Sequence, residues 1–480
     1  MNKIFLSIAF FLSSFIVINA QDNHYEALQL GAKNSILSGA TISKWQDPTA
    51  VFQNPATLSQ TVGNSISFNT AAFTIYKVKL ENNLGDKYTK KSSSTRFLPS
   101  LVGGDFRANK GESDWVWGYA IYHRNRDNLR FTNRIENNQN IINDAESPGN
   151  ENYVGQSKLE TEFDETAGVF GFGKKLNDRW SFGASFNGIF RTQDYRNAFT
   201  GNAIPDPANN PSIDLVASNS DIDVTYSKAL AQLKFGLAYQ HNGWNIGLTV
   251  MTPSVGIYGS GEIVADISLT NIKLPQNTGR KNYIASTRLA KMKPTFKYPL
   301  NVAGGITRQF TKIQLSAAAT WYAPISKYVM LDPGDAVFVR PPSDQNVLAT
   351  KNFLQVWSVN NSVVNVSFSA DWILKSNLHL LFGYALDQAY SEDKPEEPGF
   401  QLATKFWDLT HLNAGVQFIR AKSNWIIGFQ SAFGKNSHYR QPRSLDGPTE
   451  ENFLQGHPNI GIIKYTSTGI IISYSLKFGK

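Results

Sequence analysis

The chain has 480 residues, in which 46 Lys and Arg exceed 38 Asp and Glu and give a formal charge of +8. Its residues are 41% hydrophobic and 12% aromatic, which is too rich in rings for a disordered chain and too polar for a bundle of membrane helices. There is no Cys, so disulfide frameworks, thiolate metal sites and Cys nucleophiles are excluded. The basic excess is mild and spread along the chain, which indicates no nucleic-acid partner.

The first twenty residues have the pattern of a secretory signal peptide. Lys3 precedes an apolar run from Ile4 to Ile18, and the small residue Ala20 lies just before Gln21. We therefore predict a cleaved signal peptide over residues 1–20 and an exported mature chain. No later segment has the eighteen or more uninterrupted apolar residues that would suggest a membrane-spanning helix.

The next segment, residues 21–63, shows no sustained alternation of apolar and polar residues. It contains Gly31, Gly39, Pro48 and Pro55, which do not favour a regular strand or helix. Composition alone leaves two interpretations open. The segment is either a plug, which would fill the lumen of a barrel, or a flexible periplasmic tail.

From residue 64 to the C-terminus, apolar and polar residues alternate with period two. In the last run, Ile470, Ile472, Tyr474 and Leu476 alternate with small polar residues and Lys477. Equivalent runs begin at Trp180, Trp244, Leu378, Leu412 and Trp425. This period predicts strands with one apolar face, which would point inward in a soluble sandwich and outward to lipid in a membrane barrel.

The lengths of the connections favour the membrane barrel, because such barrels have short turns at one rim and long loops at the other. Short links are expected at residues 110–111, 177–178, 242–243, near 311, 375–376 and 422–423. They alternate with polar stretches that we predict to be loops, at about 125–160, 192–220, 259–293, 324–351, 388–404 and 435–461. We predict an all-β protein, a transmembrane antiparallel β-barrel of about 14 strands over residues 64–480. Since this size lies between barrels filled by side chains and water-filled porins, we expect an N-terminal plug, or hatch, formed by residues 21–63.

The string Asp47-Pro-Thr-Ala-Val-Phe-Gln-Asn-Pro-Ala56 resembles a signature of the FadL/TodX family of outer-membrane transporters for long-chain fatty acids and hydrocarbons. Gln53 departs from the aromatic or small residue that is frequent there. Further resemblances are Phe235-Gly-Leu-Ala-Tyr239, Trp244-Asn-Ile-Gly-Leu248, Thr252-Pro253, Gly259-Ser-Gly261, the segment from Tyr298 to Gly305 followed by Leu315 to Tyr322, and Asp408 with His411-Leu-Asn-Ala-Gly415. Together they cover most of the mature chain.

The resemblance implies a passive uptake channel in which extracellular loops capture a hydrophobic small molecule and a hatch lets it leave sideways through the barrel wall. The implied hatch residues are Asp47, Asn54, Pro55 and Ala56, and the implied structural residues of the motifs are Thr252, Pro253, Gly259 and Gly261. Asn-Pro restricts Asn54 to extended backbone and Pro55 has no N–H, so a fixed bend is expected. When this motif is considered alone, the alternative interpretation is an ordinary Asn-Pro turn.

Three residues are candidates for contact with a ligand. Arg191 and Lys234 fall in the lumen-facing phase of their strands and are candidates to bind a carboxylate head group. The alternatives are pairing with luminal Asp or Glu and a position at the rim against lipid phosphates. Phe338 lies in an apolar loop that either catches a ligand or packs against other loops.

No enzyme motif is supported. Gly168 to Lys174 has the spacing of a phosphate-binding loop, but Lys175 replaces the Ser or Thr that would hold magnesium, and the seven His residues have no metal-ligand spacing. We expect no metal and no cofactor. The resemblance implies a monomer in the outer membrane of a Gram-negative bacterium, surrounded by lipid and lipopolysaccharide. The alternatives are a FadL-like barrel component of a type IX secretion system and a general porin.

Overall fold

The computed structural model describes residues 24–25, 30–61, 64–82, 89–107, 115–143, 145–208, 213–273, 279–340, 350–391, 399–402, 407–441 and 443–478. The signal peptide predicted over residues 1–20 and the link predicted at 110–111 lie outside these ranges. The helical elements are α2 (Ala32–Ile36), α3 (Ala50–Gln53), the 3₁₀ helix η1 (Pro55–Gln60) and α4 (Thr350–Leu354). None of the described helices is long and apolar enough to span a membrane.

The described strands account for most of the chain. They are β1 (Asn64–Glu81), β2 (Lys90–Arg107), β3 (Trp115–Gln139), β4 (Glu151–Lys175), β5 (Trp180–Ile204), β6 (Val216–His241), β7 (Trp244–Met251), β8 (Val255–Ile272), β9 (Lys281–Met292), β10 (Asn301–Gln309), β11 (Ile313–Tyr322), β12 (Ile325–Leu331), β13 (Val339–Arg340), β14 (Val356–Asn360), β15 (Val363–Lys375), β16 (Leu378–Asp387), β17 (Leu409–Ile419), β18 (Ser423–Arg440), β19 (Ser444–Thr449), β20 (Gln455–Gly456) and β21 (Ile460–Phe478).

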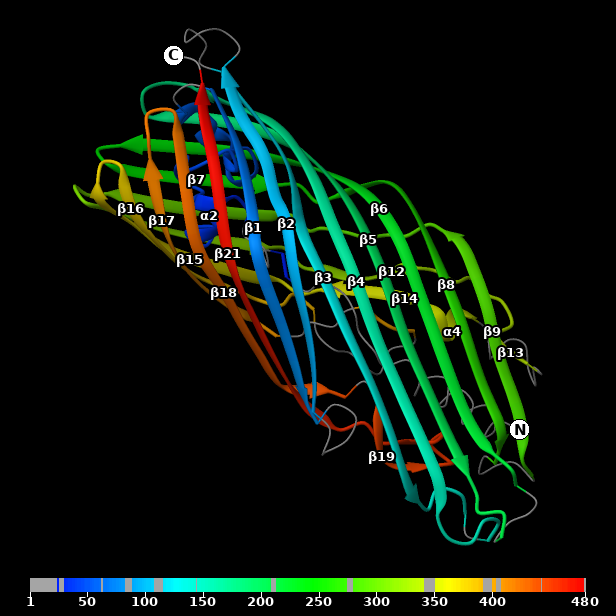
Figure 1. Cartoon of the computed structure of the whole chain (residues 1–480). Helices are drawn as coiled ribbons and strands as arrows, with labels where there is room; N and C mark the ends of the chain where they lie inside the picture. The colour runs from blue at the N-terminus through cyan, green and yellow to red at the C-terminus, as the bar shows by residue number, and fades with distance from the viewer. Residues whose placement is uncertain are drawn as a thin grey trace.

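The main sheet closes into an antiparallel barrel because β1 pairs with β2 on one side and with β21 on the other. β7 and β8 follow one another along β6, so together they form one barrel strand. β9 and β10 likewise follow one another, β9 along β8 and β10 along β7. The barrel therefore has 14 strands, which confirms the prediction (Figure 1).

The short turns lie at one end of the barrel, together with the first residue of β1 and the last residue of β21. One of them is the predicted link at Asn242 and Gly243, whose φ angles of 48° and 76° are both positive. Asn-Gly with two positive φ angles is the sequence of a type I′ turn, whose twist matches that of a hairpin. We call this end of the barrel the short-turn end and the opposite end the loop end.

A band of apolar side chains covers the outside of the barrel next to the short-turn end. On β16 and β18, for example, Phe382 is 45% exposed and Ile427 is 48% exposed. Other exposed members of this band are Phe170, Phe186, Phe235, Leu248, Phe368, Leu412, Phe429 and Ile470. Large apolar side chains that all face outward are expected for a barrel surrounded by lipid and are incompatible with a soluble sandwich.

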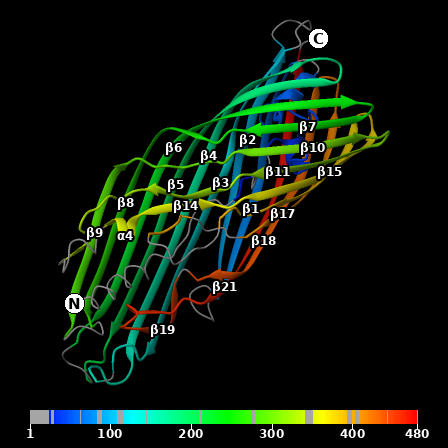
Figure 2. The same cartoon turned by 180° about the vertical axis from the view of Figure 1, so that it is seen from behind.

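Strands β3–β6 have 25 or 26 residues each. Figures 1 and 2 show that they extend at the loop end far beyond strands such as β15, β16 and β17. In this extension the polarity of the two faces is reversed. On β3, a bulge between His123 and Asn125 precedes a stretch in which Arg126 and Arg130 face outward while Leu129 is buried inside. Polar outside and apolar inside is the pattern of a sheet in water, so the strands leave the membrane there.

The prediction that residues 125–160, 192–220 and 259–293 are long loops is therefore wrong for most of their length. They are largely strand residues of β3–β6, β8 and β9. Their content of charged residues and Asn is that of a solvated outer face, and the alternation continues through them with apolar residues on the inner face. The connections left between these strands are short.

The inner face of the extension has its own apolar core, which we call the cap. It includes Phe338, Phe353 and Val356, and residues of the β19–β20 hairpin such as Leu454, whose carbonyl accepts a 2.7 Å hydrogen bond from the Tyr153 hydroxyl. Charged residues tie the outer ends of the cap together. Arg280 pairs with Glu146 at 2.8 Å and with Glu450 at 2.5 Å, and Lys273 also pairs with Glu146. The hydrogen bond from Lys273 and the charge of Arg280 lower the pKa of Glu146. The cap is an ordered structure above the membrane and not a set of independent loops.

The reversal of polarity predicts opposite responses to a new charge at two outward positions. Ile427→Arg, near the middle of the apolar band, should destabilise the barrel by about 2–4 kcal/mol. Thr200→Arg, outward on the extension of β5 between Gln156 and Asn219, should change stability by less than about 0.5 kcal/mol. Unfolding by urea in lipid vesicles measures both, and equal losses would contradict the boundary that we assign to the membrane.

Candidate functional site in the lumen

Residues 30–61, which we call the luminal segment, lie against the inner face of the barrel. Figures 1 and 2 both show this segment, in blue, surrounded by strands at the end where the C-terminus lies. Asp47 holds its first part together, because one carboxylate oxygen accepts hydrogen bonds of 3.2 Å from the backbone N–H groups of Lys33 and Asn34. The other oxygen accepts a 2.9 Å bond from the N–H of Thr49. Asp47 thus satisfies free N–H groups at the start of α2.

Asn54 joins the luminal segment to the barrel wall. Its side-chain amide donates to the carbonyl of Ile42 at 2.8 Å and to that of Leu237 on β6 at 3.0 Å. Its side-chain oxygen accepts a 3.1 Å bond from the N–H of Ala56, and Pro55 occupies the first position of η1, where a missing N–H costs nothing. The backbone of Asn54 is extended, with φ −150° and ψ 103°, as Pro55 requires.

The bend formed by Asn54 and Pro55 lies against glycines on the inner face of the wall. Gly173, Gly183 and Gly236 lie directly opposite one another on β4, β5 and β6. A Cβ atom on Gly236 would lie 2.0 Å from the side-chain oxygen of Asn54, and one on Gly183 would lie 2.5 Å from the nitrogen of Ala56. Any larger residue would force the luminal segment away from the wall.

The same kind of contact recurs around the barrel. A Cβ atom on Gly247 of β7 would lie 2.1 Å from the carbonyl oxygen of Ile42, and one on Gly383 of β16 would lie 2.2 Å from that of Ile36. Next to this contact, the Lys33 ammonium pairs with Asp371 on β15 at 2.8 Å. The luminal segment is therefore held by close backbone approaches and polar contacts on opposite sides of the lumen.

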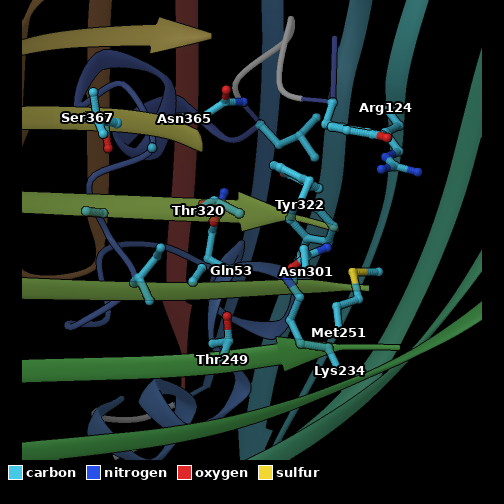
Figure 3. A pocket seen from close by; sticks show the side chains of 18 residues that line it. Gln53, Arg124, Lys234, Thr249, Met251, Asn301, Thr320, Tyr322, Asn365 and Ser367 are labelled. Carbon is cyan, nitrogen blue, oxygen red and sulfur yellow. The ribbon is translucent and has the colours of Figure 1, made fainter. Parts of the chain in front are cut away.

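An enclosed cavity of about 50 Å³ lies between the luminal segment and the wall. Figure 3 shows Gln53 of the segment among side chains from several wall strands, which include Thr249, Asn301 and Thr320. This volume holds about one water molecule and is far below the roughly 150 Å³ of a cavity that binds benzene. An organic molecule can enter only if the luminal segment moves.

Two cationic side chains line this cavity, Arg124 from β3 and Lys234 from β6. The Arg124 guanidinium lies 4.0 Å from the centre of the Tyr298 ring, and its buried Nη1 atom makes no hydrogen bond to any described residue. The Lys234 ammonium lies 4.5 Å from the centre of the Phe52 ring. A buried cation stacked on a ring attracts an anionic group that can satisfy its N–H donors.

Arg191, in contrast, is fully engaged and does not line the cavity. Its Nη1 atom pairs with Glu165 at 2.6 Å, its Nε atom donates to the Tyr226 hydroxyl at 2.8 Å, and its Nη2 atom donates to Gln193 at 3.2 Å. This is the alternative expected from the sequence, pairing with a luminal acid. Sequence reasoning missed Arg124, because the bulge at this residue breaks the phase that marks lumen-facing positions.

An aromatic cluster closes the lumen on the loop side of the cavity. Tyr25 stacks between Tyr322 and Tyr390, with ring centres 4.2 Å apart in both pairs. Its hydroxyl accepts a 2.8 Å hydrogen bond from Asn360, and the neighbouring residue His24 lies 3.2 Å from Asp387. The sequence offers no sign of this role, since Tyr25 is a single aromatic residue in a segment without periodicity.

The remaining residues singled out from the sequence lie away from the cavity. Phe338 is fully buried in the cap, with its ring centre 6.1 Å from that of Phe353, so it packs against other cap residues as the alternative interpretation had it. Thr252 accepts a 3.0 Å bond from the N–H of Leu233, and Pro253 follows it in the gap between β7 and β8. Gly259 and Gly261 lie just beyond this gap on β8. There, added Cβ atoms would meet Pro294 at 2.9 Å and Leu331 at 2.8 Å.

The fold and the site together define a membrane-spanning β-barrel whose lumen contains its own N-terminal segment. No family model matches the chain, and no curated protein matches it. Among solved structures, it is similar to a Pseudomonas aeruginosa FadL homologue, with 11% identity, a TM-score of 0.56, and coverage of 95% of this chain and 100% of the other. It is also similar to the Pseudomonas putida toluene transporter TodX, with 14% identity, a TM-score of 0.54, and coverage of 94% and 100%.

A third similar structure is the Ralstonia pickettii toluene transporter TbuX, with 11% identity, a TM-score of 0.52, and coverage of 94% of this chain and 99% of the other. The chain therefore has the fold of the FadL/TodX outer-membrane channels. The resemblance drawn from the sequence is confirmed at the level of the fold.

The close approach of Gly236 to Asn54 predicts that Gly236→Ala displaces the luminal segment, because the new methyl group would overlap the Asn54 side chain. The variant should conduct ions in a planar bilayer at a level at least about tenfold above that of the wild type. Gly168→Ala on β4 is the matched control, since a Cβ atom there would meet no atom within 4 Å. Identical conductance of the two variants would show that the contact does not hold the segment in place.

Proposed function

We propose that this protein is a passive uptake channel of the bacterial outer membrane for hydrophobic small molecules that carry an anionic head group. The observation that carries the proposal is the closed cavity between a non-covalently held luminal segment and a wall that contributes Arg124 and Lys234. The structural neighbours support the hydrophobic part, since two of them are described as toluene transporters and a third as a monoaromatic hydrocarbon channel.

The proposed route starts in the cap, whose core offers apolar side chains above the membrane, and continues past Tyr25 into the cavity. Asp47, Asn54, Pro55 and Ala56 act as the hatch, because they fix the bend that rests on the wall glycines. Movement of this bend enlarges the cavity. Since an alkyl chain gains about 0.8 kcal/mol for each methylene kept out of water, a sideways exit into the bilayer is favoured over an aqueous one.

We place this exit where two neighbouring strands are interrupted at the same height. β7 and β8 are separated at residues 252–254, and β9 and β10 are separated at residues 293–300, which include Pro294 and Pro299. Two hydrogen bonds between Ser254 and Tyr298, of 3.0 and 2.8 Å, bridge the break. Because proline cannot donate to a ladder, this is a weakly paired part of the wall, and it lies at the upper edge of the apolar band.

The charge balance of the lumen favours a carboxylate over a neutral hydrocarbon as the head of the ligand. Glu165 pairs with Arg191 at 2.6 Å, and Arg124 and Lys234 line the cavity from two different strands. A fatty acid would place its carboxylate between these two cations and its chain among the rings of Phe52 and Tyr322. A general porin is disfavoured, since a cavity of about 50 Å³ offers no path for polar solutes.

The test is native mass spectrometry of the detergent-purified protein, followed by organic extraction and identification of the bound molecules. We expect the wild type to carry a bound long-chain carboxylate. In the Arg124→Gln/Lys234→Gln variant, the occupancy of this ligand should be at least about tenfold lower than in the wild type. A control with Lys174→Gln/Lys175→Gln, at the short-turn end, should keep it. Finding a secretion subunit and no apolar molecule would instead favour the export apparatus.

Uptake should also respond to the aromatic closure. Tyr25→Ala removes the ring that stacks on Tyr322 and Tyr390, so we expect faster entry of a fluorescent fatty acid into proteoliposomes, by a factor of about three or more. Tyr25→Phe keeps the stack and loses one hydrogen bond from Asn360, and it should behave like the wild type. Slower uptake by the Ala variant would mean that Tyr25 guides the ligand and does not block it.

A further inference from the structure

We propose that the outer surface of β18, β21, β1 and β2 binds the phosphorylated head group of an outer-leaflet glycolipid, the lipid A part of lipopolysaccharide. This proposal goes beyond uptake and does not depend on it. The surface lies outside the barrel, on strands that Figure 1 shows side by side.

Four lysines form a single row across these four strands. Lys435 on β18 lies directly opposite Lys464 on β21, Lys464 opposite Lys79 on β1, and Lys79 opposite Lys91 on β2. Directly opposed residues share one face of a sheet, and Lys435, Lys464 and Lys91 are exposed on the outside. With neighbouring strands about 4.8 Å apart, the row extends over roughly 14 Å.

This row is electrostatically unfavourable by itself, because like charges directly opposite one another destabilise a sheet. One carboxylate relieves part of the repulsion, since Glu81 accepts bonds from Lys79 at 2.5 Å and from Lys464 at 2.9 Å. These bonds lower the pKa of Glu81 to about 2, so it is ionised at neutral pH. Lys91 and Lys435, at the two ends of the row, form no ion pair with any described residue, which leaves an excess of three positive charges.

Two further cations enlarge the basic surface. Lys77 lies one step along β1 toward the membrane, between Ser93 and Thr466. Arg130 on β3 is also near the row, because its backbone N–H donates to the Ser92 hydroxyl at 3.3 Å, but its guanidinium pairs with Glu160 at 3.8 Å. The surface is therefore basic across β18, β21, β1 and β2, and an anionic group with several negative charges fits it.

The height of the row on the barrel indicates a lipid head group. Lys435 is two residues beyond Phe433, which is among the last exposed aromatic residues of the apolar band on β18. The ammonium groups thus project where the bilayer meets water, and the loop end of such a barrel faces the outer leaflet. Basic clusters just outside a membrane bind acidic lipid head groups, and a row of about 14 Å accommodates more than one phosphate.

An open, mostly apolar hollow of about 630 Å³ lies on β15–β18 and shares β18 with one end of the row. Its rim consists of Phe368, Phe382, Tyr384, Leu412 and Phe429, and small residues including Ala370 and Ala414 form its floor. Ser431, at its edge, is four residues along β18 from Lys435. A glycolipid can therefore place an acyl chain in the hollow while its phosphates contact Lys435 and Lys464.

The experiment titrates the full-length purified protein in detergent with lipid A that carries both phosphates and with lipid A from which both have been removed. The Lys91→Gln/Lys435→Gln variant removes the two lysines without an ion pair and keeps the Glu81 contacts. We expect its affinity for phosphorylated lipid A to be at least about tenfold lower than that of the wild type. The control variant Lys312→Gln/Lys375→Gln replaces two exposed lysines at the short-turn end. Its affinity for phosphorylated lipid A should lie within about twofold of that of the wild type.

The Lys91→Arg/Lys435→Arg variant keeps the positive charges and should retain the affinity for phosphorylated lipid A. The different gel mobility of the folded barrel in unheated samples verifies that each variant is folded. The proposal is overturned if dephosphorylated lipid A binds equally well, if the Gln variant keeps full affinity, or if millimolar inorganic phosphate displaces the lipid completely. Fatty acid uptake by the Gln variant should equal that of the wild type, so a failed uptake proposal would not change this result.

Discussion

The direct contact of the luminal segment with glycines of the barrel wall is the interaction on which the rest of the site depends. A barrel of 14 strands has more interior space than its own inward side chains fill. Gly173, Gly183 and Gly236 are in register, so their missing side chains form a flat strip that accepts the Asn54-Pro55 bend. The segment is fixed by shape, by a few hydrogen bonds and by apolar side chains such as Ile36, Leu37 and Ile42, which pack against the wall without a covalent link to it.

The second constraint is the reversal of polarity along the long strands. Below the bulge at Arg124 apolar side chains such as Tyr119 and Ile121 face outward, and above it Arg126 and Arg130 face outward while Leu129 is buried inside. One continuous sheet is therefore surrounded by lipid over part of its length and by water over the rest. The cap has a core of the kind found in soluble proteins, and it stands directly over the luminal cavity.

These two features explain which parts of the structure follow from the sequence. The number of strands follows because lipid-facing runs such as Trp180 to Phe190 alternate clearly and Asn242-Gly243 marks a tight turn. The extensions of β3–β6 were predicted as loops, because their outward residues are as polar as loop residues. Arg191 was placed in the lumen by its phase, but its partner Glu165 lies directly opposite on another strand, and strand register is not visible in a single sequence. The in-register glycines and lysines are hidden for the same reason.

The same electrostatic attraction to anions acts on the cations inside the barrel, where the dielectric constant is low, and on those on its outer surface, where the dielectric constant is high. Under the proposed function, Arg124 and Lys234 line a cavity with little room for water, where the carboxylate of a ligand would interact with both side chains and stabilise the position of the luminal segment that makes room for it. The lysine row is exposed and screened, so each cation contributes little alone and several must act on a ligand with several charges. The two proposals therefore assign a ligand with one charge and a long chain to the lumen, and a lipid with more than one phosphate to the outer surface.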